Sequence, residues 1–563
     1  MTTMDESLSH LDGGPQLPHG SSVWSILQNG IDANPDRAAL ISVQQPPDHL
    51  ARLVGPGPVQ SPAARGPDEV LTWSYAQMRR GAARLAAVLA RHHVPPQSTT
   101  MLTFIPHSAE WALLLWVSAL RCLTVVSHMP QVLRQSEKHA ELRSTIFSRM
   151  PPAVVVVEDE AAARLVDDIR AGAGAETAAI TNQEAPFLGL CLSRLGEPRH
   201  GWVSLADCIA QIETLTEAEC AVDAVAVEDR PDRVAHLYFT SGTSGAPKGV
   251  PKTVKNLCAS TATMTGGQRP GSVVGAVLGG NFAAMALTNR EFSMDKFTSM
   301  RRIFVSGELV TDDFVRDARR VIPSAVVMPR YGMSEVIGLF GWPKGVPDSL
   351  PTHNGVVSCG MPMPGARIRV VNEEGRVARR GEAGDMHVGS DGTIQDYVYM
   401  DPTDDKHDSD AFYEDEFGRW LKTGDIAVLD EAGHVFVVGR KKELIRSVSG
   451  IIHPHMIESC LSAAFNVQIR VIGLPSPMNG DVPYPIVERF PERVGESDMK
   501  EYFVNAVGSS YCLGTILTLE QLGMESWPMT ATGKVMKREL ERAALEYMTR
   551  NPPQLAAYAT VSN

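Results

Sequence analysis

Short apolar or β-branched runs alternate with helical stretches over the first 350 residues, and this alternation is the strongest constraint on the fold. Residues 100–105, 153–158 and 325–332 are such runs, and residues 109–120 form one of the apolar stretches between them. Strands that alternate with helices indicate a mostly parallel α/β sheet. After about residue 355 the pattern changes to hairpins with EEG and EAG turns, which predicts a second, β-rich region.

The composition is that of an ordinary globular protein. The chain has 563 residues, of which 44% are hydrophobic and 21% charged, and this length predicts two to four domains. The formal net charge of −13 argues against a broadly basic surface for nucleic acid, although it allows a local basic pocket for a small anion.

The chain carries no sign of export or of a membrane span. Its eight cysteines are scattered without metal-site spacing, as expected in a reducing compartment. The polar, acidic N-terminus lacks the regions of a signal peptide, and the most apolar stretch, residues 111–120, is too short to cross a bilayer. We therefore expect a soluble cytoplasmic protein whose residues 1–22 form a flexible lead-in.

The strongest local motif is YFTSGTSGAPKG at residues 238–249. Small residues let a loop wrap closely around an anion, and a lysine adds a cation for phosphate. The loop lacks the Gly-Lys-Ser/Thr end of a Walker A motif. An ordinary surface turn is the alternative, and the loop alone leaves both open. The candidate phosphate ligands are Thr240, Ser241, Gly242, Thr243, Ser244, Gly245 and Lys248.

Four further motifs follow in a fixed order: YGMSE at 331–335, GRWLKTGD at 418–425, GRKKELI at 439–445 and PMTATGKV at 528–535. Together with the loop they resemble the signatures of the adenylate-forming superfamily, which includes acyl-CoA synthetases, aryl-CoA ligases, luciferases and peptide-synthetase adenylation domains. The similarity extends over nearly the whole chain.

This resemblance implies the fold. It predicts an α/β protein with a large N-terminal domain over residues 23–438, made of α/β-layered subdomains and a β-barrel-like subdomain. A small α+β C-terminal domain would occupy residues 439–563. In relatives the small domain rotates about a hinge after adenylation, and Lys442 stands at that position.

The resemblance also implies the roles of individual residues in binding ATP, Mg²⁺ and the acid. Lys534 would be the catalytic lysine, and Glu335 would hold Mg²⁺ and serve in catalysis. The other predicted ATP contacts are Gly307 and Glu308 beside the adenine, Tyr331, Gly332 and Ser334 at the adenine and α-phosphate, Asp425 at the ribose, and Arg440 at the ribose or a phosphate.

The sequence departs from the family pattern in two places. Only 66 positions separate Ser241 from Gly307, whereas relatives have a longer segment that helps to form the acyl pocket, so we expect a shortened region near 260–300. In the hinge element Ser449 stands where relatives have glycine, and Gly450 follows one position late. A side chain at positive φ there would cost about 1 kcal/mol.

Three functions remain open from the sequence. The first is an ATP-dependent acid:CoA ligase, with CoA as the co-substrate. The second is adenylation of an acid for a carrier protein acting in trans, and the third is a nucleotide-binding pseudoenzyme with a truncated acyl pocket. The activated acid is not readable from the sequence, and nucleic acid is not an expected partner.

Overall fold

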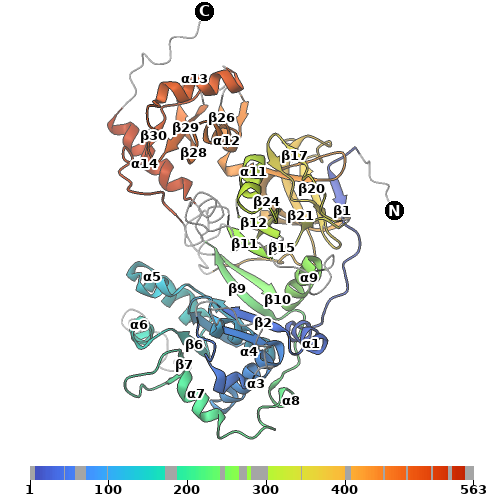
Figure 1. Cartoon of the computed structure of the whole chain (residues 1–563), viewed down its shortest axis with the longest axis vertical. Coiled ribbons are helices and arrows are strands. Elements are labelled where there is room, and N and C mark those ends of the chain that lie inside the picture. Colours follow the sequence, from blue (N-terminus) through green and yellow to red (C-terminus); the bar gives the residue numbers. More distant parts are fainter. Residues whose placement is uncertain are drawn as a thin grey trace, which may run out of the picture.

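A computed structural model describes residues 7–42, 45–56, 71–97, 99–171, 187–240, 248–265, 275–279, 302–307, 309–343, 345–399, 408–447, 450–476, 480–508, 512–529 and 535–551. The chain forms three regions along its long axis (Figure 1): an N-terminal α/β region, a β-rich middle region and a C-terminal region. No helix in these described ranges is long and apolar enough to cross a membrane.

The N-terminal region is built on an eight-stranded sheet with the order β22-β10-β9-β5-β4-β6-β7-β8. The strands from β9 to β8 are parallel, as the sequence predicts, and β10 and β22 are antiparallel. The bounds are β4 (Thr100–Phe104), β5 (Thr124–Ser127), β6 (Val154–Val157), β7 (Leu188–Cys191), β8 (Trp202–Ser204), β9 (Val234–Thr240), β10 (Lys248–Thr253) and β22 (Val398–Tyr399).

Helices cover both faces of this sheet, and the burial of strand β6 shows that each face packs into its own core. Its four valines are fully buried: Val154 and Val156 face one core, Val155 and Val157 the other. A strand buried on both faces reads as a continuous apolar run. The helices are α1 (Val23–Ala33), α2 (Ala51–Val54), α3 (Tyr75–Arg91), α4 (Ala109–Arg121), α5 (Ser136–Leu142), α6 (Glu160–Ala171), α7 (Leu205–Ile212), α8 (Val222–Val225) and α9 (Val254–Thr265), and β2 (Ala38–Ser42) pairs with β3 (Leu71–Ser74).

A second parallel sheet contains β11 (Gly275–Gly279), β12 (Arg302–Ser306) and β13 (Val326–Arg330), with α11 (Asp312–Val321) in the β12–β13 crossover. In the described part of the chain this sheet has three strands. Residues 280–301, where the sequence departs from the family, lie outside the described residues, so the shortened region stays a prediction.

Three two-stranded pairs follow β13 and lead into the larger antiparallel sheet. They join β14 (Gly332–Met333) to β15 (Val336–Ile337), β16 (Phe340–Gly341) to β19 (Met361–Pro362), and β17 (Thr352–His353) to β18 (Val356–Val357).

A six-stranded antiparallel sheet forms the middle region, in the order β1-β20-β21-β24-β23, with β25 also paired to β24. Its strands are β1 (His10–Asp12), β20 (Arg367–Val371), β21 (Ala383–Gly389), β23 (Phe412–Asp415), β24 (Gly418–Leu429) and β25 (Val435–Arg440). The predicted EEG and EAG hairpins are β20–β21 and β24–β25.

Strand β1 corrects one expectation. It lies inside the predicted flexible lead-in, yet His10–Asp12 pairs with Arg367–Arg369. A three-residue edge strand with one apolar side chain between two polar ones gives almost no periodic signal, which is why the sequence pattern did not reveal it.

After β25 the chain leaves the middle sheet. The short 3₁₀ turn η7 (Lys441–Glu443) leads into a separate sheet with the order β27-β26-β29-β28, to which β30 adds in parallel. Its elements are β26 (Ile445–Ser447), β27 (Gly450–Ile452), α12 (Pro454–Phe465), β28 (Ile469–Ser476), β29 (Gly480–Val487), α13 (Glu496–Val507), β30 (Leu517–Thr518) and α14 (Lys537–Arg550). The mixed helices and strands match the predicted α+β class.

Candidate active site

The predicted phosphate loop connects two antiparallel strands. Thr240 ends β9 and pairs with Lys248, the first residue of β10, so both ends of the loop are fixed by the sheet. Ser241, Gly242, Thr243, Ser244 and Gly245 lie outside the described residues. The ammonium of Lys248 lies 5.4 Å from the ring centroid of Tyr397, a cation–π distance that places this cation beside the strand β22.

The best-defined polar cluster joins two of the sequence motifs. Asp425 is 3% exposed, and its Oδ2 accepts a 2.6 Å hydrogen bond from the Tyr331 hydroxyl. Its Oδ1 lies 3.1 Å from Nε of Arg440, which is opposite Asp425 in the β24–β25 pair. The structure thus brings together three residues predicted to contact the nucleotide.

Tyr331 is held as a neutral hydrogen-bond donor. Burial, and then the Asp425 carboxylate, raise the pKa of its hydroxyl well above the ordinary value. Its ring centroid lies 5.6 Å from that of Phe340 in a tilted arrangement. A protonated phenol next to a buried carboxylate fixes both groups without placing two negative charges side by side.

Glu335 lies on the turn that connects β14 to β15, with its side chain buried. Its Oε1 accepts a 2.8 Å hydrogen bond from the hydroxyl of Tyr397, the ring that lies beside Lys248. Ser334 is exposed on the same turn and Gly332 begins β14. The structure therefore connects the predicted metal ligand to the end of the phosphate loop through one tyrosine.

Lys252 is a buried residue of this site that the sequence motifs did not reveal. It is 3% exposed, and its ammonium donates to the backbone carbonyls of Glu335 at 2.7 Å and Gly392 at 3.4 Å. Burial lowers its pKa to about 8, although Glu335 opposes the shift. The spacing of residues in this strand offered a signal for its burial. Lys252 lies two positions after Val250, hence on the same face of the strand, and Val250 is fully buried.

This buried amine predicts a pH dependence of stability. Between the folded pKa of about 8 and the ordinary 10.5, the unfolded chain holds a proton that the folded chain has lost, so the free energy of unfolding rises with pH. A Lys252→Met variant has no amine at this position and therefore lacks this contribution to the pH dependence. The stability of the wild type relative to the variant should therefore increase by about 3 kcal/mol between pH 7.5 and 10.5, as measured by urea unfolding. A difference that stays flat over this range would contradict a buried, shifted lysine.

Only some of the other predicted site residues lie within the described residues. Gly307 follows β12 with φ +87°, a backbone conformation that favours glycine, whereas Glu308 and Lys534 lie outside the described residues. Met529 and Val535, both within the PMTATGKV motif, form an antiparallel bridge. Lys442 lies in η7, between the last strand of the middle sheet and the first of the C-terminal sheet.

The irregular hinge element contains a glycine with a positive φ. Gly450 has φ +120°, a backbone conformation that favours glycine. Ser449 itself lies outside the described residues.

The residues present fit a magnesium ion bound together with ATP. Mg²⁺ in phosphate sites is usually held by one or two carboxylates plus phosphate oxygens, and Glu335 offers one buried carboxylate whose Oε1 is already oriented by Tyr397. In the described segments, no group of three or more His, Cys, Asp or Glu side chains forms a metal site by itself. Glu335 would hold the ion together with phosphate oxygens of the nucleotide.

Comparisons with known proteins agree with this geometry. The sequence model of the family described as AMP-binding enzyme matches residues 34–286 and 277–398, more than half of the chain. An acyl-CoA ligase of Pestalotiopsis microspora is 28% identical over 597 aligned residues, which cover 96% of this chain and 99% of that protein. Because 597 exceeds the 563 residues of the chain, the alignment includes positions at which this chain has no residue.

Solved structures share the fold. The anthranilate CoA ligase AuaEII in complex with anthranoyl-AMP aligns with a TM-score of 0.69 at 18% identity, over 94% of this chain and 98% of that one. McyG A-PCP complexed with phenylalanyl-adenylate aligns with a TM-score of 0.66 at 16% identity, over 96% and 97%. The chain therefore belongs to the AMP-binding enzyme family, and its fold is that of the adenylate-forming acyl- and aryl-CoA ligases.

Proposed function

We propose that this protein is an acid:CoA ligase that uses ATP. In the first step a carboxylate oxygen attacks the α-phosphorus of ATP, the bond between the α-phosphorus and the bridging oxygen breaks, and pyrophosphate leaves. In the second step the CoA sulfur attacks the acyl carbon, AMP leaves and the thiol loses its proton. The observation that carries the proposal is the buried Asp425 carboxylate, held by Tyr331 and Arg440.

Each group of the site has a defined task in the first step. Asp425 accepts hydrogen bonds from the ribose hydroxyls, and the ring of Tyr331 packs beside the adenine. Lys248 and the phosphate loop bind the β- and γ-phosphates. Glu335 holds Mg²⁺, which neutralises phosphate charge when bound. Lys534 stabilises the negative charge shared by the acid and the α-phosphate.

Two alternatives make different predictions for the second step. The structural likeness to McyG A-PCP supports an acceptor on a carrier protein. The relative from Pestalotiopsis microspora, which aligns over nearly its full length, is an acyl-CoA ligase and supports CoA as the acceptor. A pseudoenzyme would bind ATP but activate no acid. Exchange of pyrophosphate without thioester formation would favour a carrier protein, and ATP binding without acid-dependent exchange would favour the pseudoenzyme.

The task of Asp425 can be tested with deoxynucleotides. A hydrogen bond to a charged group contributes about 1.5–3 kcal/mol, so the wild type should use 2′-deoxy-ATP and 3′-deoxy-ATP at least about tenfold less efficiently than ATP. Asp425→Ala should be slow with ATP, by about 10²-fold or more, and should no longer distinguish the three nucleotides. The measurement is kcat/KM for acid-dependent pyrophosphate release.

Asp430→Ala is the matched control, because Asp430 lies at the other end of the same hairpin and pairs with His434. It should discriminate among the nucleotides as the wild type does. If Asp425→Ala still prefers ATP over both deoxynucleotides, the ribose is bound elsewhere.

A further inference from the structure

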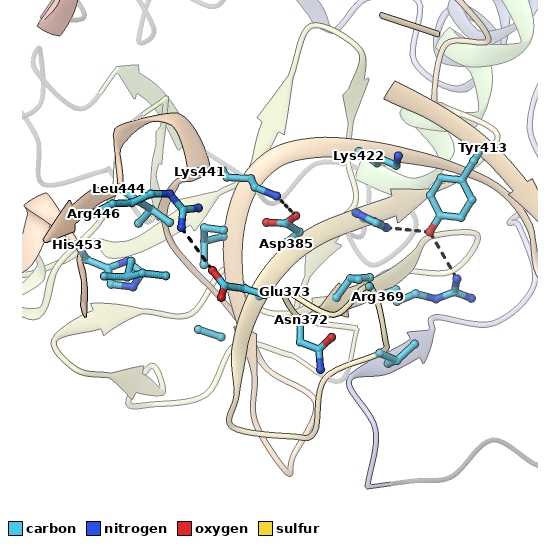
Figure 2. Close-up of a pocket in the computed structure, with 18 residues that line it drawn as sticks. Arg369, Asn372, Glu373, Asp385, Tyr413, Lys422, Lys441, Leu444, Arg446 and His453 are labelled. Atoms are coloured by element: carbon cyan, nitrogen blue, oxygen red, sulfur yellow. Dashed lines mark hydrogen bonds and ion pairs between the residues drawn. The ribbon is translucent and has the colours of Figure 1, made fainter. Parts of the chain in front are cut away.

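A cavity of about 750 Å³ lies between the middle sheet and the start of the C-terminal domain. One wall comes from β20, β21, β23 and β24, and includes Arg369, Asp385 and Tyr413. The other wall comes from the chain after β25, and includes Arg446 and His453. Figure 2 shows the two walls facing each other across the cavity. Its volume is in the range of small-molecule sites.

This cavity is separate from the predicted nucleotide contacts. Lys422 and Ile426 of β24 line it, whereas Asp425, between them, turns to Tyr331 and Arg440. Neighbouring side chains of a strand point to opposite faces. The cavity thus lies behind the proposed ribose carboxylate.

The floor of the cavity is a fixed polar network. The Tyr413 hydroxyl hydrogen-bonds Nδ1 of His387 at 2.8 Å. It also accepts a hydrogen bond from Arg369 at 3.4 Å, which Figure 2 shows. Asp415 pairs with Arg369 at 2.7 Å, and burial lowers the pKa of His387 to about 4. The floor therefore carries no net charge at physiological pH, and the charge available to a ligand lies at the rim.

Three cations stand at the rim. Lys441 pairs with Asp385, and Arg446 lies 3.6 Å from Glu373, but surface pairs of this kind contribute little to stability. Lys422 has no carboxylate within ion-pair distance among the described residues. A dianion can therefore attract all three cations at little cost in existing pairs.

Apart from the amide of Asn372, the rest of the lining is largely apolar. Val371, Val377, Ile426, Leu444 and Ile451 contribute aliphatic surface to the same cavity. A ligand that fills it must combine a compact, doubly charged group with an apolar body, and the cavity is several times larger than one phosphate ion requires.

We propose that this interdomain cavity binds a small organic phosphate, with the phosphate at Lys422, Lys441 and Arg446 and its apolar body against the aliphatic lining. Because the walls lie on opposite sides of the Lys442 segment, a bound ligand stabilises the observed orientation of the C-terminal domain. If the proposed two-step reaction requires that domain to rotate, the ligand slows complete turnover; this consequence rests on the proposed function, whereas the binding does not.

Calorimetric titration of the full chain with phenyl phosphate tests the proposal. Saturating ATP is present so that the nucleotide site is occupied, and acid and CoA are left out, so the result does not depend on the proposed reaction. Phenyl phosphate should bind at least about tenfold more tightly than inorganic phosphate, phenol or benzenesulfonate, which lack the body, the anion or the second charge.

Variants from both walls locate the site. Lys422→Gln and Arg446→Gln should each weaken binding about tenfold, whereas Lys500→Gln, a lysine of α13 paired with Glu496, should bind as the wild type does. No saturable binding with ATP present, equal binding by all three variants, or equally tight binding of inorganic phosphate would overturn the proposal.

Discussion

Replacing Lys534 by alanine is expected to lower the rate of acyl-adenylate formation about 10³-fold. The acid and the α-phosphate are both anions, and a positioned cation lowers the cost of bringing them together in the transition state. The same variant should convert preformed acyl-adenylate and CoA into thioester at close to the wild-type rate, since no new phosphate bond forms in that step. Single-turnover measurements of the two half-reactions separate these effects.

Lys500→Ala is the control for this experiment, because it removes a lysine from the same domain outside the PMTATGKV motif. It should leave both half-reactions unchanged. Equal losses in the two half-reactions of Lys534→Ala would contradict the role assigned to the lysine.

Replacing Glu335 by glutamine is expected to lower acyl-adenylate formation by about 10²–10³-fold, because an amide carries no charge to hold Mg²⁺. Tyr397→Phe should have a smaller effect, on the Mg²⁺ requirement rather than on the maximal rate. It removes the 2.8 Å hydrogen bond to Oε1 but leaves the carboxylate, so the Mg²⁺ concentration for half-maximal rate should rise about tenfold while the rate at saturating Mg²⁺ stays near the wild-type value.

Tyr502→Phe, an exposed tyrosine of α13, is the matched control and should show the wild-type Mg²⁺ dependence. If Tyr397→Phe lowers the maximal rate without changing the Mg²⁺ requirement, the tyrosine does not act by orienting the carboxylate.

Local patterns predicted much of the fold. The valine run of β6 and the EAG hairpin of β24–β25 carry their structure in neighbouring residues, and the hairpin register brings Asp425 opposite Arg440. The order of the five motifs then identified the family, and the match of the family model confirmed it.

Contacts between distant segments could not be predicted in this way. The hydrogen bond from Tyr331 to Asp425 joins residues 94 positions apart, and Lys252 reaches the carbonyl of Glu335 across 83 positions. Neither contact leaves a periodic trace in the sequence. The same is true of β1, whose pairing with β20 depends on the shape of an edge more than 350 residues away.

The central claim is that this protein activates a carboxylic acid as its adenylate. The most direct test is ATP–pyrophosphate exchange by the purified full chain with Mg²⁺, across panels of aliphatic, aryl and amino acids. The account predicts exchange that depends on one class of acid and is lost in Lys534→Ala. ATP binding without acid-dependent exchange for any acid in the panels would contradict it.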